Sequence, residues 1–423
     1  MKKTLTLLSA FLLLMTSSLM AQTITQTNTQ FPNPGFEYWK DHGSNSATTP
    51  GTNARQVPYN WHTFDESTGT YALAAAKKNH HHSMNYNNAA MSQYTGGTTN
   101  NSRYIGIACK YVNYLVIDAM ANGALSTGRT SVGSTTPANS NNYNYTDVSS
   151  NSSYSTSGKF SWPFVGCPDS MSFYYKTSMS NAAVRPLFKV FLHGNGEFRD
   201  RADGTLYGNT SGNSAVRLIG CSVDTFAQSS SWKRETYPFT YSQPPTSYGN
   251  NYSFLGQTNN SLDPTYGYYT ALNRPTYILA SFSTDKKAGN ESQSDGDALY
   301  IDELWCIYDK GLKMLTINGI ENSAALNHFN AQEFLKHEPT RTYASNSGNP
   351  TFNNSGTASF VYTESFCYAT DGDFPQVMAK PKSKYVSNFT ITQATTENHY
   401  ATISVTHNDN STFVDWSGIR SGW

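Results

Sequence analysis

Asp297-Ala-Leu-Tyr-Ile-Asp-Glu-Leu-Trp305 is the stretch that decides the fold, together with a matching stretch near the N-terminus, Phe31-Pro-Asn-Pro-Gly-Phe-Glu-Tyr-Trp39. Each stretch carries an acidic residue in an aromatic run next to turn-forming residues. Such runs, bounded by Gly, Pro, Asn or Asp, are typical of β-strands. We expect the two stretches to mark the beginning and the end of one β-sandwich.

Further strand-like runs lie between these ends, at Tyr104–Cys109, Ser170–Lys176, Leu187–Leu192 and Tyr277–Phe282. Turn residues separate the runs, so the sequence predicts an all-β chain. The segments Ser131–Ser157 and Pro244–Thr270 are rich in Asn, Ser, Gly and Tyr, and we expect both to be long loops.

A domain boundary is expected near Asp309-Lys-Gly311, where the last strand of the large sandwich ends. We predict a jelly-roll β-sandwich over residues 22–310. A second set of strand-like runs follows, with the spacing of a small immunoglobulin-like β-sandwich over residues 311–423. The final run, which ends at Trp423, is expected to form an atypical edge.

The N-terminus has the features of a signal peptide. Lys2 and Lys3 precede the apolar run from Leu5 to Met20, and Ala21 offers a cleavage point. We therefore predict residues 1–21 to be a signal peptide and the mature chain to be secreted, to the periplasm, the cell surface or the medium. No later apolar run approaches the roughly 18 residues that a membrane span needs, so we expect no membrane span.

The composition excludes some partners. The chain has 423 residues, with 29 Lys and Arg against 29 Asp and Glu, so its net charge is zero. No basic field attracts nucleic acid, and we expect no nucleic-acid partner. Charged residues are only 14% of the chain, whereas 29 Tyr and 22 Phe are present. This neutral, aromatic composition suits secreted β-sandwiches in general and sugar-binding ones among them.

The cysteines do not form a metal motif. They are odd in number and widely spaced, and most lie inside strand-like runs. We expect most of them to be buried free thiols, although export permits disulfides and the spacing fixes no pairing. The five positions are Cys109, Cys167, Cys221, Cys306 and Cys367.

Residues 31–309 resemble the family of secreted bacterial proteins called the putative carbohydrate metabolism domain. The resemblance rests on the two terminal stretches and on three blocks between them in the same order. The blocks are Ala121–Gly128, Pro163–Lys176 and Pro275–Ser283. The family implies a jelly-roll fold similar to carbohydrate-binding modules, in which the first and last strands pair and their acids can share a structural cation.

Two sets of candidate site residues follow. Glu37 and Asp302 are the candidate ligands of a structural Ca²⁺, because Ca²⁺ takes six to eight oxygen ligands and the terminal strands would bring both carboxylates together. Aromatic side chains in or near loops are the candidate sugar-stacking residues, although packing alone accounts for any single one of them. These residues are Trp162, Trp232, Tyr248, Tyr252 and Tyr268.

The leading hypothesis is a secreted, non-catalytic protein that binds a polysaccharide or host glycan through loop aromatics and amides. An alternative is a structural or adhesion protein whose sandwich faces bind other cell-surface proteins, which a large exposed apolar patch would favour. A second alternative is a glycoside hydrolase-like enzyme, which requires two acids in one cleft. No acidic residue lies in a recognisable catalytic motif, so the sequence assigns no catalytic residue.

Overall fold

The structure is a computed structural model of the chain. It describes residues 29–36, 39–41, 56–72, 104–114, 117–149, 159–208, 216–243, 250–257, 269, 272–309, 312–317, 358–366, 376–386, 388–395, 397, 400–406 and 412–421.

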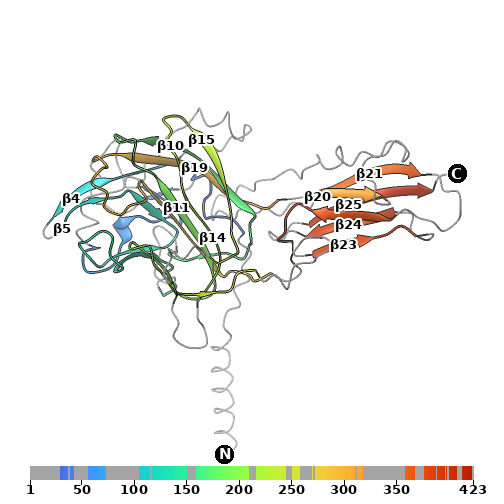
Figure 1. The fold of residues 1–423 in the computed structure, drawn as a ribbon, viewed down its shortest axis with the longest axis horizontal. Helices are drawn as coiled ribbons and strands as arrows, with labels where there is room; N and C mark the ends of the chain where they lie inside the picture. Colours follow the sequence, from blue (N-terminus) through green and yellow to red (C-terminus); the bar gives the residue numbers. More distant parts are fainter. Residues whose placement is uncertain are drawn as a thin grey trace, which may run out of the picture.

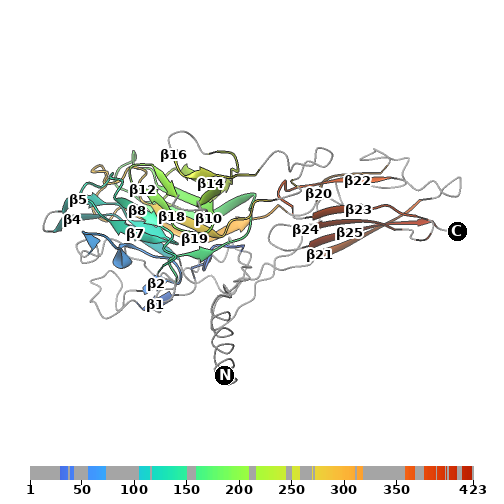
Figure 2. The same ribbon diagram turned by 90° about the horizontal axis from the view of Figure 1, so that it is seen from below.

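The described part is almost entirely β-structure (Figures 1 and 2), with one short 3₁₀ helix at Phe64–Glu66 (η1). The expectation of an all-β chain built from β-sandwiches is confirmed. No helix among the described residues is long and apolar enough to cross a membrane.

Sheet 1 has the strand order β15-β10-β19-β3. Its strands are β3 (Ile105–Ala108), β10 (Ser170–Ser178), β15 (Lys233–Pro238) and β19 (Ala298–Ile307).

Sheet 2 has the order β17-β14-β11-β18-β6, with β9 also paired to β18. Its strands are β6 (Ala124–Ser126), β9 (Trp162–Pro163), β11 (Leu187–His193), β14 (Arg217–Thr225), β17 (Ser253–Phe254) and β18 (Tyr277–Ser283).

The main core lies between sheets 1 and 2. Alternate residues of β10 point into it, and Phe173 is fully buried there. The Phe173 ring lies 5.7 Å from that of Phe188 on β11 and 5.2 Å from that of Phe282 on β18. Aromatic side chains bury a large apolar area and pack edge to face, so the Phe- and Tyr-rich strands supply most of the driving force for this sandwich.

Sheet 3 covers the outer face of sheet 2. Its order is β16-β13-β12-β8-β7, and a second core forms where Phe198 of β12 meets Phe191 of β11, with the rings 5.6 Å apart. Strand β11 is therefore covered on both faces. The strands of sheet 3 are β7 (Arg129–Val132), β8 (Asn142–Tyr145), β12 (Phe198–Arg201), β13 (Leu206–Gly208) and β16 (Asn250–Asn251).

The two segments predicted to be long loops contain short strands. Strand β8 lies inside the segment 131–157, and β16 and β17 lie inside the segment 244–270. Asn-rich strands of two to four residues lack the hydrophobic alternation that identifies longer strands. Two hairpin-like pairs complete this part, formed by β1 (Trp39–Asp41) with β2 (Gln56–Pro58) and by β4 (Lys110–Tyr114) with β5 (Ile117–Ala121).

The two stretches that decide the fold do lie together. The Leu304 amide of β19 donates to the Pro34 carbonyl at 2.8 Å, and Trp61 is buried against Phe31 and Phe36. Phe36 and Glu303 have φ angles of 49° and 50°, a strained conformation for non-glycine residues. Their pairing as strands is wrong, however, because β1 pairs with β2, while β19 pairs with β3 and β10.

Strands β20–β25 form separate sheets at the end of the molecule opposite β4 and β5 (Figure 1). Strand β25 pairs with β24 on one side and, in parallel, with β21 on the other, so it is an interior strand and the predicted edge is wrong. The strands are β20 (Leu312–Ile317), β21 (Ala358–Phe366), β22 (Val377–Pro381), β23 (Asn388–Thr392), β24 (Tyr400–Thr406) and β25 (Thr412–Ser421).

Polar contacts join the two parts. Asp169, at the start of β10, accepts hydrogen bonds from the Asp309 amide at 2.9 Å and from the Ser383 hydroxyl at 2.8 Å. Beside it, the rings of Tyr241 and Tyr385 lie 4.6 Å apart. The division at residue 310 remains a prediction about independent domains.

The cysteines behave as expected where the structure describes them. Cys109, Cys167, Cys221 and Cys306 are buried and free. Burial raises the pKa of Cys109 to about 11, so its thiol stays protonated and unreactive. Cys367 lies outside the described residues.

Candidate functional site

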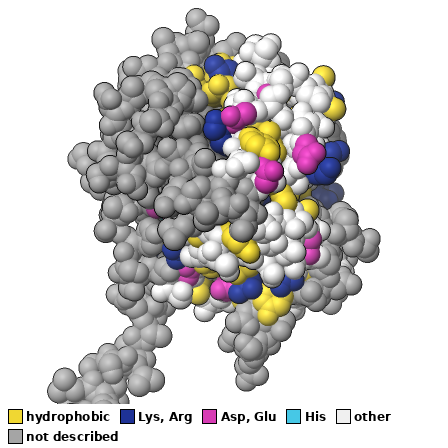
Figure 3. Space-filling view, turned by 90° about the vertical axis from the view of Figure 1, so that its left-hand side faces the viewer, with side chains coloured by type: hydrophobic (Ala, Val, Ile, Leu, Met, Phe, Trp, Pro, Cys, Tyr) yellow, Lys and Arg dark blue, Asp and Glu magenta, His cyan; other side chains and the backbone are white. Residues whose placement is uncertain are grey.

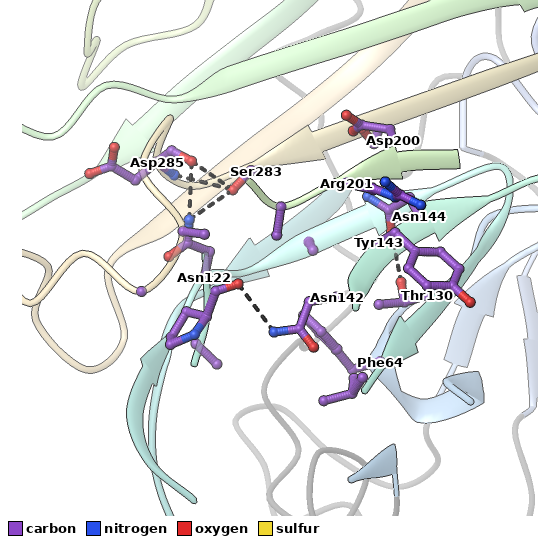
Figure 4. Close-up of a pocket in the computed structure, with 18 of the residues that line it drawn as sticks. Phe64, Asn122, Thr130, Asn142, Tyr143, Asn144, Asp200, Arg201, Ser283 and Asp285 are labelled. Atoms are coloured by element: carbon purple, nitrogen blue, oxygen red, sulfur yellow. Dashed lines mark hydrogen bonds between the residues drawn. The ribbon is translucent and has the colours of Figure 1, made fainter. Parts of the chain in front are cut away.

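A cavity of about 210 Å³ lies between sheets 2 and 3. Strands β11 and β18 form its base, β7, β8 and β12 form one wall, and β5 with the loop 284–289 forms the other (Figure 4). Its lining combines apolar side chains with a few polar groups, which is the usual character of a small-ligand site. The apolar residues include Val112, Ala119, Met120, Val132, Pro137 and Leu187.

An ion pair lies in this cavity. Lys189 of β11 contacts Asp200 of β12 through Nζ and Oδ1 at 2.8 Å, and their side chains are 17% and 4% exposed. Burial raises the pKa of Asp200, and the positive charge of Lys189 opposes that rise. The pair is placed here by the sheet geometry, because Lys189 is the only charged residue of β11 and Asp200 faces inward from β12.

Asn144 of β8 supplies an amide next to the ion pair. Its Oδ1 accepts a hydrogen bond from the Thr130 hydroxyl at 2.8 Å. Its Nδ2 has no acceptor among the residues that the structure describes. In Figure 4, Asn144, Thr130, Tyr143, Asp200 and Arg201 lie on the same side of the cavity.

The opposite wall is held by its own hydrogen bonds. The Asn122 amide donates to the Ser283 hydroxyl at 3.1 Å and to the carbonyls of Asp285 and Lys287 at 3.1 and 3.0 Å. It also accepts a hydrogen bond from Gln293 at 2.8 Å. All of its polar groups are thus used to fix the loop, so Asn122 shapes the cavity and is not free to bind a ligand.

Two carboxylates line the cavity, Asp200 and Asp285. Asp285 accepts from the Lys287 amide through Oδ1 at 3.0 Å and from Asn290 through Oδ2 at 2.5 Å. Asp200 is paired with Lys189. Glycosidases need one acid to donate a proton and a second to act as base or nucleophile. Neither role suits Asp285, whose carboxylate stabilises a loop.

In the structure, Trp162 packs against the main core. It lies half-buried on β9 against the main core, and its Nε1 donates to the Gln30 carbonyl at 2.9 Å. Trp232 lies beside sheet 1, where its ring meets Tyr104 edge-on at 5.0 Å and the Lys176 ammonium lies 5.2 Å from its centroid.

Tyr252 packs against the second core, and burial raises its pKa. Tyr248 and Tyr268 lie outside the described residues. Of the three described members of this set, Trp162 lies on β9 and the other two lie in no strand, and none of the three lines the cavity. Their role in sugar binding stays a prediction.

The candidate calcium site is described only in part. Asp302 is 1% exposed, and its Oδ1 accepts from the Glu303 amide at 2.8 Å. Glu37 lies outside the described residues. Across the part of the chain that the structure describes, no three His, Cys, Asp or Glu side chains come together as metal ligands. Calcium binding therefore remains a prediction.

The large exposed apolar patch that would favour an adhesion protein is not seen among the described residues. Their exposed large hydrophobic side chains are Tyr111 on β4 and Met378 on β22, in different parts of the molecule. At the end of the molecule that carries β4 and β5, hydrophobic side chains form small groups among charged and polar atoms (Figure 3).

Lys189, Asn144 and the buried position of Asp200 were not predicted from the sequence. The segment from Glu197 to Asp203 reads as a solvated, self-paired loop in the sequence. Arg199 does contact Glu197, at 2.5 Å, but the segment contains β12 and Asp200 points inward. A single Lys inside the apolar run Leu187–His193 is the signal that could have identified the site, because a buried Lys requires a partner.

No family model matches the chain, and no curated protein matches it. Among solved structures, the chain is similar to a putative glycoside hydrolase from Bacteroides thetaiotaomicron VPI-5482, with 12% identity, 64% of this chain and 71% of that chain covered, and a TM-score of 0.33. It is also similar to a putative glycoside hydrolase from Bacteroides vulgatus ATCC 8482, with 16% identity, 66% and 97% covered, and a TM-score of 0.33.

Proposed function

We propose that this chain is a secreted, non-catalytic glycan-binding protein that holds a sugar unit in the cavity between sheets 2 and 3. The observation that carries the proposal is the Lys189–Asp200 ion pair beside Asn144 within largely apolar walls. Two charges kept inside a cavity are costly unless their remaining hydrogen-bonding capacity is used. A polyhydroxylated ligand would use it.

Both the polar groups and the apolar walls of the cavity suit a sugar. Sugar hydroxyls can donate to Asp200 and accept from Lys189 and from the Asn144 amide, which are mostly charge-assisted hydrogen bonds. The C–H faces of a sugar ring can contact apolar walls such as Val132 and Met120. The volume of about 210 Å³ is below the roughly 300 Å³ at which drug-sized pockets begin, so we expect one sugar unit to be enclosed.

The other parts of the chain have supporting roles in this proposal. The strands after residue 310 act as a spacer or docking module. A structural Ca²⁺ held by Glu37 and Asp302 would stabilise the contact between the N-terminal stretch and β19. Secretion follows from the predicted signal peptide.

A glycan-array screen of residues 22–423 with calcium present tests the proposal. We expect binding to one glycan class, and a loss of about tenfold on Asn144→Ala, since removing one hydrogen bond to the ligand costs about 1–1.5 kcal/mol. Ala119→Trp, which fills the cavity, should abolish binding. Matched controls are Asn388→Ala and Ala183→Trp, because both residues are exposed and neither lines the cavity.

The outcomes separate the alternatives. Folded protein that binds no glycan overturns the proposal and favours a protein partner. Release of reducing sugar from a bound glycan, lost on Asp200→Asn with folding retained, would show a glycoside hydrolase instead. Binding that survives both cavity variants would place the glycan elsewhere on the molecule.

A further inference from the structure

Strand β12 presents different chemistry on its two faces. Phe198 and Asp200 are buried toward sheet 2, whereas Arg199 and Arg201 alternate with them and are partly exposed on the outer face of sheet 3. Successive side chains of a strand point to opposite faces, so β12 turns Asp200 into the cavity and carries Arg199 and Arg201 on its other face, where Arg201 still reaches the cavity rim.

These arginines are stacked with tyrosines from the neighbouring strands. The Arg199 guanidinium lies 4.5 Å from the ring centroid of Tyr143 and 5.4 Å from that of Tyr207. The Arg201 guanidinium lies 4.8 Å from the ring centroid of Tyr207. We call these four residues the Arg–Tyr ladder. Stacking on a ring covers one face of a guanidinium and leaves its in-plane N–H donors for a planar anion.

The two arginines differ in their polar partners. Arg199 donates through Nε to Glu197 at 2.5 Å. The Arg201 side chain forms no hydrogen bond or ion pair with any residue that the structure describes, and its buried Nε has no partner. The nearby Asp203 uses Oδ1 to accept from the amide and hydroxyl of Thr205, at 3.0 and 2.7 Å. Arg201 is therefore a positive charge, held in place by stacking, with its donors unused.

One end of the Arg–Tyr ladder lies at the cavity. Tyr143 and Arg201 both line it, and Figure 4 places them next to Asn144 and Asp200 on the same wall. The other charges on that side are paired, because Lys189 contacts Asp200 and Arg199 contacts Glu197. A ligand in the cavity would meet Arg201 at the rim of this wall, while Lys286 of the loop 284–289 also lines the cavity.

We infer that the ligand is an acidic glycan, whose carboxylate or sulfate group binds Arg201 while the adjoining sugar lies on Tyr143. This inference deepens the proposed function and rests on it. Arginine suits such a group, because its planar donors match the two oxygens of a carboxylate or sulfate. The tyrosine rings offer faces for sugar C–H groups and continue outward along sheet 3, so further units of an acidic polysaccharide could follow them.

Isothermal titration of residues 22–423 at moderate salt tests the inference. The probes are an oligogalacturonate, its fully methyl-esterified neutral form, and a chondroitin sulfate oligosaccharide with its desulfated form. We expect one acidic probe to bind about tenfold or more tightly than its neutral counterpart, and the preferred probe identifies carboxylate or sulfate as the group recognised. Arg201→Gln should remove that preference, whereas Arg217→Gln, at an exposed position of β14, should preserve it.

The titrations separate this inference from the proposed function. Equal binding of acidic and neutral probes, unchanged by Arg201→Gln, overturns the acidic ligand and leaves the glycan site intact. Acidic binding that persists in Ala119→Trp overturns the inference, because the anion would then be held outside the cavity. Failure of every probe, together with a blank array, overturns both. Arg201→Lys keeps the charge but loses the planar donors, and an acid preference retained in full would contradict the guanidinium geometry.

Discussion

Gln30 and Cys306 exchange two hydrogen bonds, with Gln30 Nε2 donating to the Cys306 carbonyl and the Cys306 amide donating to Gln30 Oε1, both at 2.8 Å. The side-chain amide of Gln30 thereby replaces a neighbouring strand for β19. Together with the bond from Tyr308 Oη to the Thr29 carbonyl at 2.7 Å, it fixes the N-terminal stretch on the last strand of the sandwich. Apart from the hydrogen bond between the Leu304 amide and the Pro34 carbonyl, side-chain contacts take the place of the backbone pairing expected between these stretches.

Gln30→Met should destabilise the large sandwich. Methionine has a similar length but leaves the buried amide and carbonyl of Cys306 without partners, and each such loss costs about 1–3 kcal/mol. We expect a decrease in the free energy of unfolding of about 2–4 kcal/mol, measured by urea denaturation. Gln243→Met, at an exposed position, should change it by less than about 0.5 kcal/mol. Equal effects of both changes would show that the Gln30 amide does not hold β19.

Trp162 should prove to be a packing residue and not a sugar platform. Its Nε1 donates to the Gln30 carbonyl and its ring lies against the main core, away from the cavity. Trp162→Phe removes that hydrogen bond and some apolar contact, so we expect a loss of about 1–2 kcal/mol in unfolding free energy and unchanged glycan affinity. An affinity that falls at unchanged stability would restore Trp162 to the binding surface.

The long strands could be predicted from the sequence, whereas the short polar strands that line the site could not. Strands β10, β18 and β19 have seven to ten residues, with apolar residues alternating or continuous, so local pattern identifies them. The short strand β8 reads Asn142-Tyr-Asn-Tyr145 and is stabilised by pairing with β7 and β12. Its polar sequence carries no such signal, and sheet 3 was missed with it.

The cavity depends on pairings between distant segments. Lys189 and Asn144 line the same cavity because β11 and β8 belong to stacked sheets, and no spacing in the sequence encodes that arrangement. Loop aromatics were predicted as ligand residues because aromatic rings bind sugars. Burial decides between packing and binding, and burial follows from tertiary structure.

Calcium should stabilise the protein if Glu37 and Asp302 hold a structural ion. A ligand at a hundred times its dissociation constant adds about 2.7 kcal/mol to the folded state, so we expect a melting temperature several degrees higher in millimolar Ca²⁺ than in EDTA. Asp302→Asn keeps an oxygen for the Glu303 amide but lowers the ligand charge, so it should abolish the difference. Asp224→Asn, at an exposed position, is the control. Identical melting curves in Ca²⁺ and EDTA would remove the ion from the proposal.

Asp169 should make the protein less stable as the pH rises from about 4 to 7. Burial raises the pKa of Asp169 from 3.8 to about 7, although the hydrogen bonds from the Asp309 amide and the Ser383 hydroxyl lower it. The folded state therefore binds a proton that the unfolded state releases. The resulting stability is fully present below pH 3.8 and is lost as the pH approaches 7. The shift corresponds to about 4 kcal/mol at most.

His193 has the opposite effect on how stability changes with pH. The pH profile of the wild type alone therefore does not isolate the contribution of Asp169. Burial lowers the pKa of His193 to about 4, and the folded state gains stability as the pH rises from there toward 6.5. Comparison with Asp169→Asn removes the histidine contribution, because it is common to both proteins. Urea denaturation at several pH values should show the variant gaining on the wild type by a few kcal/mol between pH 4 and 7. A difference that stays constant over this range would show that Asp169 is ionised in the folded protein throughout, and that the junction with Ser383 holds a carboxylate.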